Sequence, residues 1–442
     1  MHSNRASDSM FERLSKTQRE SAYRIYPTAL ADMVFTLGLT TTDSYFLSLV
    51  APDFLYTGVL FAIFLNVSLM HCQVVASLAA AKHDSDELFI IFICCFVGIM
   101  YGIICYFSTL PLLHWAGIKK NNLDLSILYC QLSGISVTFI ALRKAANAIF
   151  ANKASSLSIF GSIALFSVNI LLDLLGYLFF FHNRSLFVIS IGLGSVVAEA
   201  CAATLALGLL KRPRVNNSKR GTLRDASLII LSGAISSIEV VSNSALNYTL
   251  LTAMSGFDPQ LLHIRNIVAP AFVVFSANSI AWSIYANREL GQLYRSGMWR
   301  EGWELSKIIA KIGLRTLLLL SIPWIILIIV INRRLFIDNM EISALVLLVS
   351  ILVEVCKLIT INFLVSLRIV GAISVAVCAS VVVNGTICLI FIVLTHYARE
   401  PSSSLAILTL LAYPTSELAR LLANTCIVYR SLANKTLGAL SF

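Results

Sequence analysis

The sequence predicts an all-α integral membrane protein with about 12 transmembrane helices. The chain has 442 residues, of which 58% are hydrophobic and only 13% are charged, and its mean hydropathy is +0.83. A soluble domain carries about 25% charged residues, so this composition excludes a water-facing surface of ordinary size. The apolar residues also come in runs of about 20 to 27, which are long enough to cross the hydrocarbon core as helices.

Each expected crossing is an apolar run bounded by polar residues, proline or both. Pro52 with Asp53, and Glu400 with Pro401, are examples of such boundaries. The expected crossings are 26–50, 55–81, 88–113, 125–151, 157–181, 186–210, 227–253, 260–286, 305–331, 342–367, 370–396 and 403–429.

The longest polar interior stretch, Lys211 to Asp225, divides these crossings into two sets of six. The sequence therefore predicts two six-helix lobes related by pseudo-twofold symmetry. The fourth helix of each lobe ends in a Leu-Arg pair, Leu142-Arg143 and Leu367-Arg368. The predicted organisation is an N-terminal tail at 1–24, a first lobe at 25–210, a basic linker at 211–226, a second lobe at 227–432 and a C-terminal tail at 433–442.

The net charge of +10 lies mainly between the apolar runs, where positive residues set topology. The tail before the first crossing and the central linker are the most basic segments, so we expect both termini to be cytoplasmic. We expect a multi-pass protein of the cell (inner) membrane whose partners are the lipid bilayer and a small molecule, with no nucleic acid. The ten cysteines form no CxxC pair, so neither a disulfide scaffold nor a structural metal site is expected.

Several carboxylates interrupt the crossings, and each costs about 2.5–3.5 kcal/mol at the centre of a membrane helix. Glu417 has Arg420 three residues on and is expected to pair with it, whereas Glu354, three residues before Lys357, suits a structural or a functional role equally. Four acids have no basic residue within four positions and are expected to be functional: Asp43, Asp173, Glu199 and Glu239. His71 fits a satisfied core histidine better than a proton relay.

Spacing joins three of these side chains into one candidate site. Asn169 and Asp173 lie four residues apart on one helix face, and Asp43 is expected at a similar depth in the outer half of its own helix. Together they offer hard oxygen ligands for Na⁺ or an acceptor for a proton. Burial favours the neutral form of a carboxyl group, which suits a site that loads and unloads protons.

These residues occur in segments that resemble the multidrug and toxic-compound extrusion (MATE) family, within the multidrug/lipid/polysaccharide exporter superfamily. The first crossing, YPTALADMVFTLGLTTTDSYFLSLVA, resembles the family's opening helix, and VNILLD resembles its Asn-x-x-x-Asp motif. ISSIEVVSN and LVEVCKLITINFLVSLRIVGA are similar to its seventh and tenth helices, and QVVASLAAAKHDSDEL and ANRELGQLYRSGMW are similar to its paired cytoplasmic links. The chain departs from the family at Glu199, which stands near the family's small-residue run.

The resemblance implies a cation-coupled antiporter, driven by H⁺ or Na⁺, that exports small amphipathic or cationic compounds by alternating access. Asp43, Asn169, Asp173 and Glu199 would bind the coupling cation, and Glu239 and Glu354 would line the substrate cavity. No other cofactor is expected, and we expect a monomer. The alternative is a lipid-linked oligosaccharide flippase of the same superfamily, which would need several deep arginines for its anionic substrate. A membrane-embedded transferase fits least, because no loop is long enough for a catalytic domain, so an enzyme is not expected.

Overall fold

The computed structural model describes residues 15–51, 55–83, 86–115, 120–153, 155–210, 221–257, 273–331, 340–370, 373–397 and 403–439. Several predicted segments fall outside these ranges. They are residues 1–14 of the N-terminal tail, 211–220 of the basic linker, 260–272 of the eighth expected crossing and 440–442 of the C-terminal tail.

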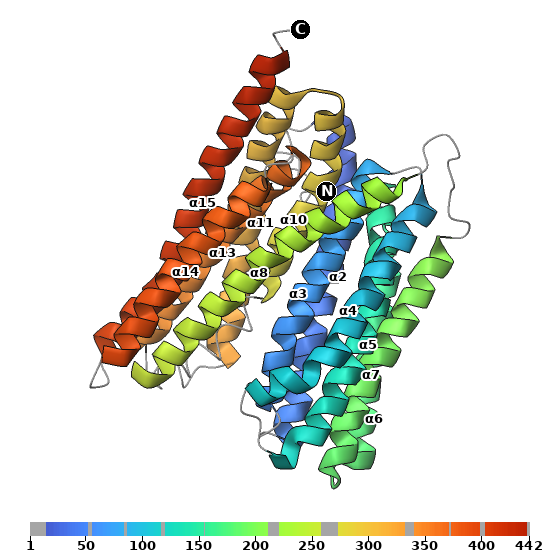
Figure 1. Ribbon diagram of the computed structural model, residues 1–442, viewed down its shortest axis with the longest axis vertical. Coiled ribbons are helices and arrows are strands. Elements are labelled where there is room, and N and C mark those ends of the chain that lie inside the picture. Colours follow the sequence, from blue (N-terminus) through green and yellow to red (C-terminus); the bar gives the residue numbers. More distant parts are fainter. Residues whose placement is uncertain are drawn as a thin grey trace. The chain divides into compact units, whose positions relative to one another are not determined.

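The described residues form helices joined by short connections, which confirms the predicted all-α fold (Figure 1). The helices are α2 (Lys16–Val50), α3 (Leu55–Lys82), α4 (Glu87–Trp115), α5 (Lys120–Asn152), α6 (Ser158–Phe180), α7 (Arg184–Leu209), α8 (Leu223–Phe257), α10 (Val273–Arg295), α11 (Trp299–Ile331), α13 (Met340–Val370), α14 (Ile373–Tyr397) and α15 (Ser403–Ala439). Within the described ranges, 8 of these helices are long and apolar enough to cross a membrane. The chain is therefore a multi-pass membrane protein.

Several helices extend beyond the apolar runs that predicted them, because polar flanking residues also favour helix. The helix α8 begins at Leu223, four residues before the expected crossing. Thr222 and Asp225 explain this start, since each side chain accepts a hydrogen bond from the other's backbone N–H, at 3.1 and 3.0 Å. This reciprocal arrangement satisfies two amide groups that a helix N-terminus otherwise leaves free.

The helices form two compact units, and the division between them runs through two helices. The N-terminal unit is Pro27–Ser237, and the C-terminal unit is Met1–Tyr26 with Ile238–Phe442. The beginning of α2 packs in the C-terminal unit, where the Tyr26 ring stacks on Trp282 at 4.5 Å between centroids. The beginning of α8 packs in the N-terminal unit, where the carbonyl of Ile230 lies 3.1 Å from Nε2 of His71. Pro27, at the division in α2, removes one helical hydrogen bond from its interior.

Both units pack their helices in the same order. In the N-terminal unit α3, α4 and α5 contact one another, and α7 packs on both α5 and α6. In the C-terminal unit α10, α11 and α13 contact one another, and α15 packs on both α13 and α14. The predicted internal repeat is therefore present in the helix packing. The lobe boundaries at 25–210 and 227–432, with their cytoplasmic tails, remain predictions.

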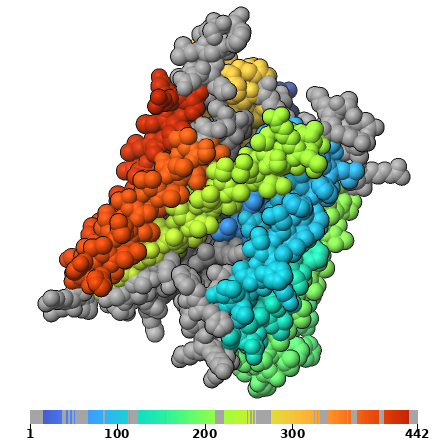
Figure 2. Space-filling view, viewed as in Figure 1, coloured from blue at the N-terminus to red at the C-terminus, as the bar shows by residue number. Residues whose placement is uncertain are grey.

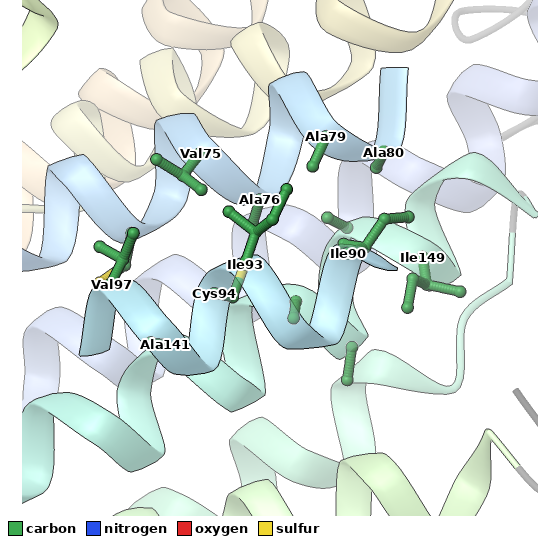
Figure 3. Close-up of a cluster of buried hydrophobic side chains, with 14 of the residues drawn as sticks. Val75, Ala76, Ala79, Ala80, Ile90, Ile93, Cys94, Val97, Ala141 and Ile149 are labelled. Carbon is green, nitrogen blue, oxygen red and sulfur yellow. The ribbon is translucent and has the colours of Figure 1, made fainter. Parts of the chain in front are cut away.

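The core of the N-terminal unit is built from small and β-branched side chains of α3, α4 and α5. Figure 3 shows Val75, Ala76 and Ala79 of α3 facing Ile90 and Ile93 of α4, and all five are buried. Alanine and glycine allow the helix backbones to approach closely, which is how helices associate where lipid removes most of the hydrophobic driving force.

Large apolar side chains cover the outer surface of each unit. In the space-filling view α4 (light blue) and α14 (orange) lie on the visible surface of their own units (Figure 2). α4 exposes Phe92 and Phe107, and α14 exposes Val382 and Leu389, all by more than half of their area. A soluble protein rarely exposes such patches, so these surfaces fit contact with lipid.

Candidate functional site

Three helices of the N-terminal unit bring Asp43, Asn169, Asp173 and Ser195 together, and we call this group the aspartate cluster. The Nδ2 atom of Asn169 donates to Oδ1 of Asp43 at 2.8 Å and to Oδ2 of Asp173 at 3.0 Å. Ser195 of α7 donates to the second oxygen of Asp43 at 2.8 Å. The amide nitrogen of Asn169 therefore bridges the two carboxyl groups. The three residues that spacing had joined are thus in direct contact.

The aspartate cluster contains more hydrogen-bond acceptors than donors. Asn169 and Asp173 have no solvent-exposed area, yet Oδ1 of each lacks a hydrogen-bond partner. No basic side chain of the described residues hydrogen-bonds to either aspartate. Two buried carboxylates bonded to the same amide nitrogen repel each other, and a proton or another cation between them relieves that repulsion. The arrangement is therefore chemically suited to hold one small cation or one proton.

A second buried group lies in the same unit, and we call it the ion quartet: Asp32, Arg143, Lys144 and Glu199. Arg143 holds both oxygens of Glu199, at 2.9 and 3.0 Å, and one oxygen of Asp32 at 2.8 Å. Lys144 holds the other oxygen of Asp32 at 3.0 Å. Ser162 also donates to Asp32. Two cations balance two carboxylates, so the quartet is neutral and its acids are fully bonded.

The structure does not bring Glu199 into contact with the three other residues predicted to bind the coupling cation. Glu199 lies one helical turn after Ser195 on α7, and its carboxylate faces Arg143. No local pattern indicated this partner, because 56 positions separate the two residues. The predicted role of Glu199 in cation binding stays a prediction, but its charge is already neutralised.

The C-terminal unit has an ion cluster of its own, formed by the half-buried Lys357 and by four buried residues, Glu239, Glu354, Glu417 and Arg420. Arg420 of α15 bonds to Glu239 of α8 and, at 2.8 Å, to Glu417. Lys357 and Ser276 bond to Oε1 of Glu354, at 3.1 and 3.0 Å. Three carboxylates face two cations, which leaves one excess negative charge if all are ionised. Oε2 of Glu354 and of Glu417 lack hydrogen-bond partners.

Both local pairs that the sequence suggested are present in this cluster. Glu417 pairs with Arg420, as predicted, and Glu354 pairs with Lys357. Sequence reasoning missed the contact between Arg420 and Glu239. It also missed Lys144, whose place directly after Arg143 did not indicate that both side chains point inward. His71 contacts the Tyr101 hydroxyl and the Ile230 carbonyl, which fits the expected core histidine.

The fold and these buried polar clusters define a multi-pass α-helical membrane protein with charged groups inside both of its helical units. Comparison with solved structures identifies the fold more closely. Over 95% of its length the chain superposes with a TM-score of 0.71 on 95% of a MOP-superfamily transporter from Pyrococcus furiosus, reported for the reverse polarity of its binding pocket, at 13% sequence identity. An outward-facing multidrug resistance MATE family transporter of the same superfamily gives 0.66 at 12% identity, covering 96% of both chains.

A third solved structure, a proline-to-alanine mutant of a MATE protein, gives a TM-score of 0.70 at 12% identity and covers 96% of this chain and 98% of that one. No protein-family model matches the sequence. No curated protein matches it either. At these identities the structural likeness establishes the fold, which is that of the MATE and MOP-superfamily transporters and which confirms the resemblance seen in the sequence.

Proposed function

We propose that this protein is a cation-coupled antiporter that exports small amphipathic or cationic compounds by alternating access. The observation that carries the proposal is the aspartate cluster, in which two carboxyl groups and an amide oxygen are buried without a basic partner. Carboxylates at such depth usually mark an ion or substrate pathway. The fold shared with MATE transporters supports the same conclusion.

Either H⁺ or Na⁺ would serve as the coupling cation. The carboxyl groups of Asp43 and Asp173 bond to the same amide nitrogen, and this closeness favours a proton, because a proton shared between two carboxylates turns their repulsion into a hydrogen bond. Loading would cancel one of the two negative charges of the cluster and bring α2, α6 and α7 together. Unloading would leave two repelling carboxylates and favour a looser arrangement of these helices. This difference supplies the two states that alternating access requires.

The C-terminal ion cluster would supply the charge that attracts the substrate. Glu239 and Glu354 are already paired with Arg420 and Lys357, so neither acts as a free carboxylate. With all three acids ionised, the cluster as a whole would carry one excess negative charge, which would favour a substrate with a single positive charge. The attraction for the cationic substrate would then come from three acids on three helices together.

The flippase alternative finds less support in these contacts. Recognition of an anionic, phosphate-bearing substrate needs arginines that are free to bind it. The four buried or half-buried basic residues of the two ion groups, Arg143, Lys144, Lys357 and Arg420, are each paired with a carboxylate. We further propose that the protein works as a monomer in the cell (inner) membrane with both termini in the cytoplasm.

The proposal is tested by reconstituting the purified protein in proteoliposomes and imposing a proton gradient and a sodium gradient separately. Transport of a fluorescent monovalent organic cation should follow one of the two gradients. Asp173→Asn should abolish this transport while the protein still inserts and elutes as a monodisperse peak. Glu341→Gln makes the same chemical change at an exposed helix start and is the control. Unchanged transport by Asp173→Asn would remove the cluster from the mechanism.

A further inference from the structure

A group in the C-terminal unit resembles the aspartate cluster in joining three helices through a buried asparagine, but it has no carboxylate, and we call it the Asn384 cluster. Nδ2 of Asn384 on α14 donates to Oδ1 of Asn243 at 2.7 Å and to the Ser242 hydroxyl at 3.0 Å, both on α8. Ser416 of α15 donates to Oδ1 of Asn384 at 2.7 Å. The amide of Asn384 thus joins the first, fifth and sixth helices of its unit, as the amide of Asn169 and the hydroxyl of Ser195 do in the other.

The helices α6 and α14 bury nearly the same positions relative to their asparagines, except that Asp173 is buried and its counterpart Cys388 is half-buried. Asn169 and Asn384 are both almost fully buried. The other buried residues of α14 are Ile373, Ala376, Val377, Ser380 and Phe391, and each has a buried counterpart at the same spacing from Asn169: Ser158, Gly161, Ser162, Leu165 and Gly176. The helices therefore pack in the same register, and the clusters occupy equivalent places.

The substitutions between the clusters remove both carboxylates. Asn243 accepts the bond that Asp43 accepts in the N-terminal unit. Four residues after the asparagine, Asp173 is replaced by Cys388, a free thiol. An amide and a thiol are neutral at physiological pH. The Asn384 cluster therefore carries no charge to be neutralised.

The two clusters also differ in how many of their hydrogen-bond acceptors have a partner. In the aspartate cluster Oδ1 of Asn169 and Oδ1 of Asp173 lack partners. In the Asn384 cluster the amide oxygen accepts from Ser416, and the amide nitrogen donates to two oxygens. One cluster is completed only by an added cation, whereas the other is complete with its own side chains.

We propose that the Asn384 cluster is a permanently closed counterpart of the cation site, so that of these two equivalent places only the aspartate cluster binds the coupling cation. It holds α8, α14 and α15 in the arrangement that α2, α6 and α7 reach when a cation is bound between their carboxylates. Cation loading then changes the helix packing of the N-terminal unit and leaves that of the C-terminal unit unchanged. This inference rests on the proposed cation site. It goes beyond that proposal by stating that the equivalent place in the C-terminal unit binds no coupling cation.

Exchanging the carboxylates between the two places tests the inference. Four proteins are compared in detergent: the wild type, Asp43→Asn/Asp173→Cys, Asn243→Asp/Cys388→Asp, and the variant with all four changes. Bound sodium is counted with radioactive ²²Na⁺. Proton binding is measured by the carbonyl stretching band of protonated carboxyl groups in pH-difference infrared spectra. We expect one cation site in the wild type and none in Asp43→Asn/Asp173→Cys. Asn243→Asp/Cys388→Asp should have two cation sites, and the variant with all four changes should have one.

The outcomes separate the two proposals. A wild type that loads neither cation contradicts the proposed function itself. The inference is overturned if the single cation site of the wild type persists in Asp43→Asn/Asp173→Cys. It is also overturned if Asn243→Asp/Cys388→Asp folds but gains no cation site. If the latter variant does not fold, Asn384→Ala decides. It should lower thermal stability and leave the cation affinity of the wild type unchanged, and a lowered affinity would overturn the inference.

Discussion

Arg143 donates two parallel hydrogen bonds to Glu199, from Nε at 2.9 Å and from Nη2 at 3.0 Å, and both side chains are almost fully buried. Such a bidentate pair fixes α5 against α7 with defined geometry. The same guanidinium also reaches Asp32 on α2. Arg143 is therefore the hub through which three helices of the N-terminal unit are joined.

Removing this hub should destabilise the protein strongly. Arg143→Met leaves Glu199 buried without a cation and leaves Asp32 with Lys144 as the one cation bonded to it. Breaking a buried ion pair in this way costs about 3–5 kcal/mol. The measurement is thermal unfolding in detergent followed by intrinsic fluorescence. Lys307→Gln, which breaks the exposed pair of Lys307 and Glu304, should cost about 0–1 kcal/mol and is the control.

A double variant separates loss of charge balance from loss of packing. Arg143→Met with Glu199→Met removes one cation and one anion together, and Asp32 keeps Lys144 as its partner. Replacing a buried ion pair by apolar side chains is often neutral or stabilising. We therefore expect the double variant to recover most of the stability lost by Arg143→Met. No recovery would mean that the quartet acts through its shape instead.

Gly194 offers a way to tell proton from sodium coupling. A Cβ atom added at Gly194 would lie 3.5 Å from the unpartnered Oδ1 of Asp173, beside the place where a cation would sit. A methyl group there fills space that a sodium ion and its ligands need, whereas a proton needs none. We expect Gly194→Ala to retain proton-driven transport and to abolish any sodium-driven transport in proteoliposomes.

The control for this variant lies on the same helix. A Cβ added at Gly208 meets nothing within 4 Å, so Gly208→Ala should transport as the wild type does under either gradient. Sodium-driven transport that survives Gly194→Ala at full rate would place the sodium site away from Asp173. The same methyl group would lie 3.3 Å from Cβ of Leu172, so loss of proton-driven transport in the variant would show that it disturbs the carboxyl pair or the packing of α6 against α7.

The sequence predicted the fold because membrane helices are encoded as long apolar runs, and it predicted the contact of Asn169 with Asp173 because four residues make about one helical turn. It did not predict which deep acids are neutralised. Glu199 and Glu239 have no basic neighbour in sequence, yet each meets an arginine from a distant helix. Such pairs depend on the rotation of one helix against another, which apolar periodicity does not specify where all faces are apolar.

The close approach of α4 to α5 depends on Gly98. A Cβ added at Gly98 would lie 2.8 Å from the Ala141 side chain and 2.9 Å from the backbone of Thr138, and the backbone cannot move aside cheaply. Gly98→Ala should therefore destabilise the protein by about 1–3 kcal/mol through overpacking. Gly385→Ala adds the same methyl group where nothing lies within 4 Å, and it should be neutral or slightly stabilising. Thermal unfolding of the two variants provides the comparison, and equal stability would contradict this packing.

Replacing Arg420 should lower the stability of the protein by an amount that depends on pH. Arg420→Met leaves Glu239, Glu354 and Glu417 buried with Lys357 as their cation. Unpaired buried carboxylates take up protons more readily in the folded state than in the unfolded state, so lowering the pH stabilises the folded variant. Compared with the wild type, the variant should lose about 3–5 kcal/mol at neutral pH and regain part of this in acid. Adding Glu239→Gln removes one of the unpaired charges and should reduce both the loss and its pH dependence. A deficit that stays constant from neutral to acidic pH would show that Arg420 stabilises α15 by packing instead of by charge.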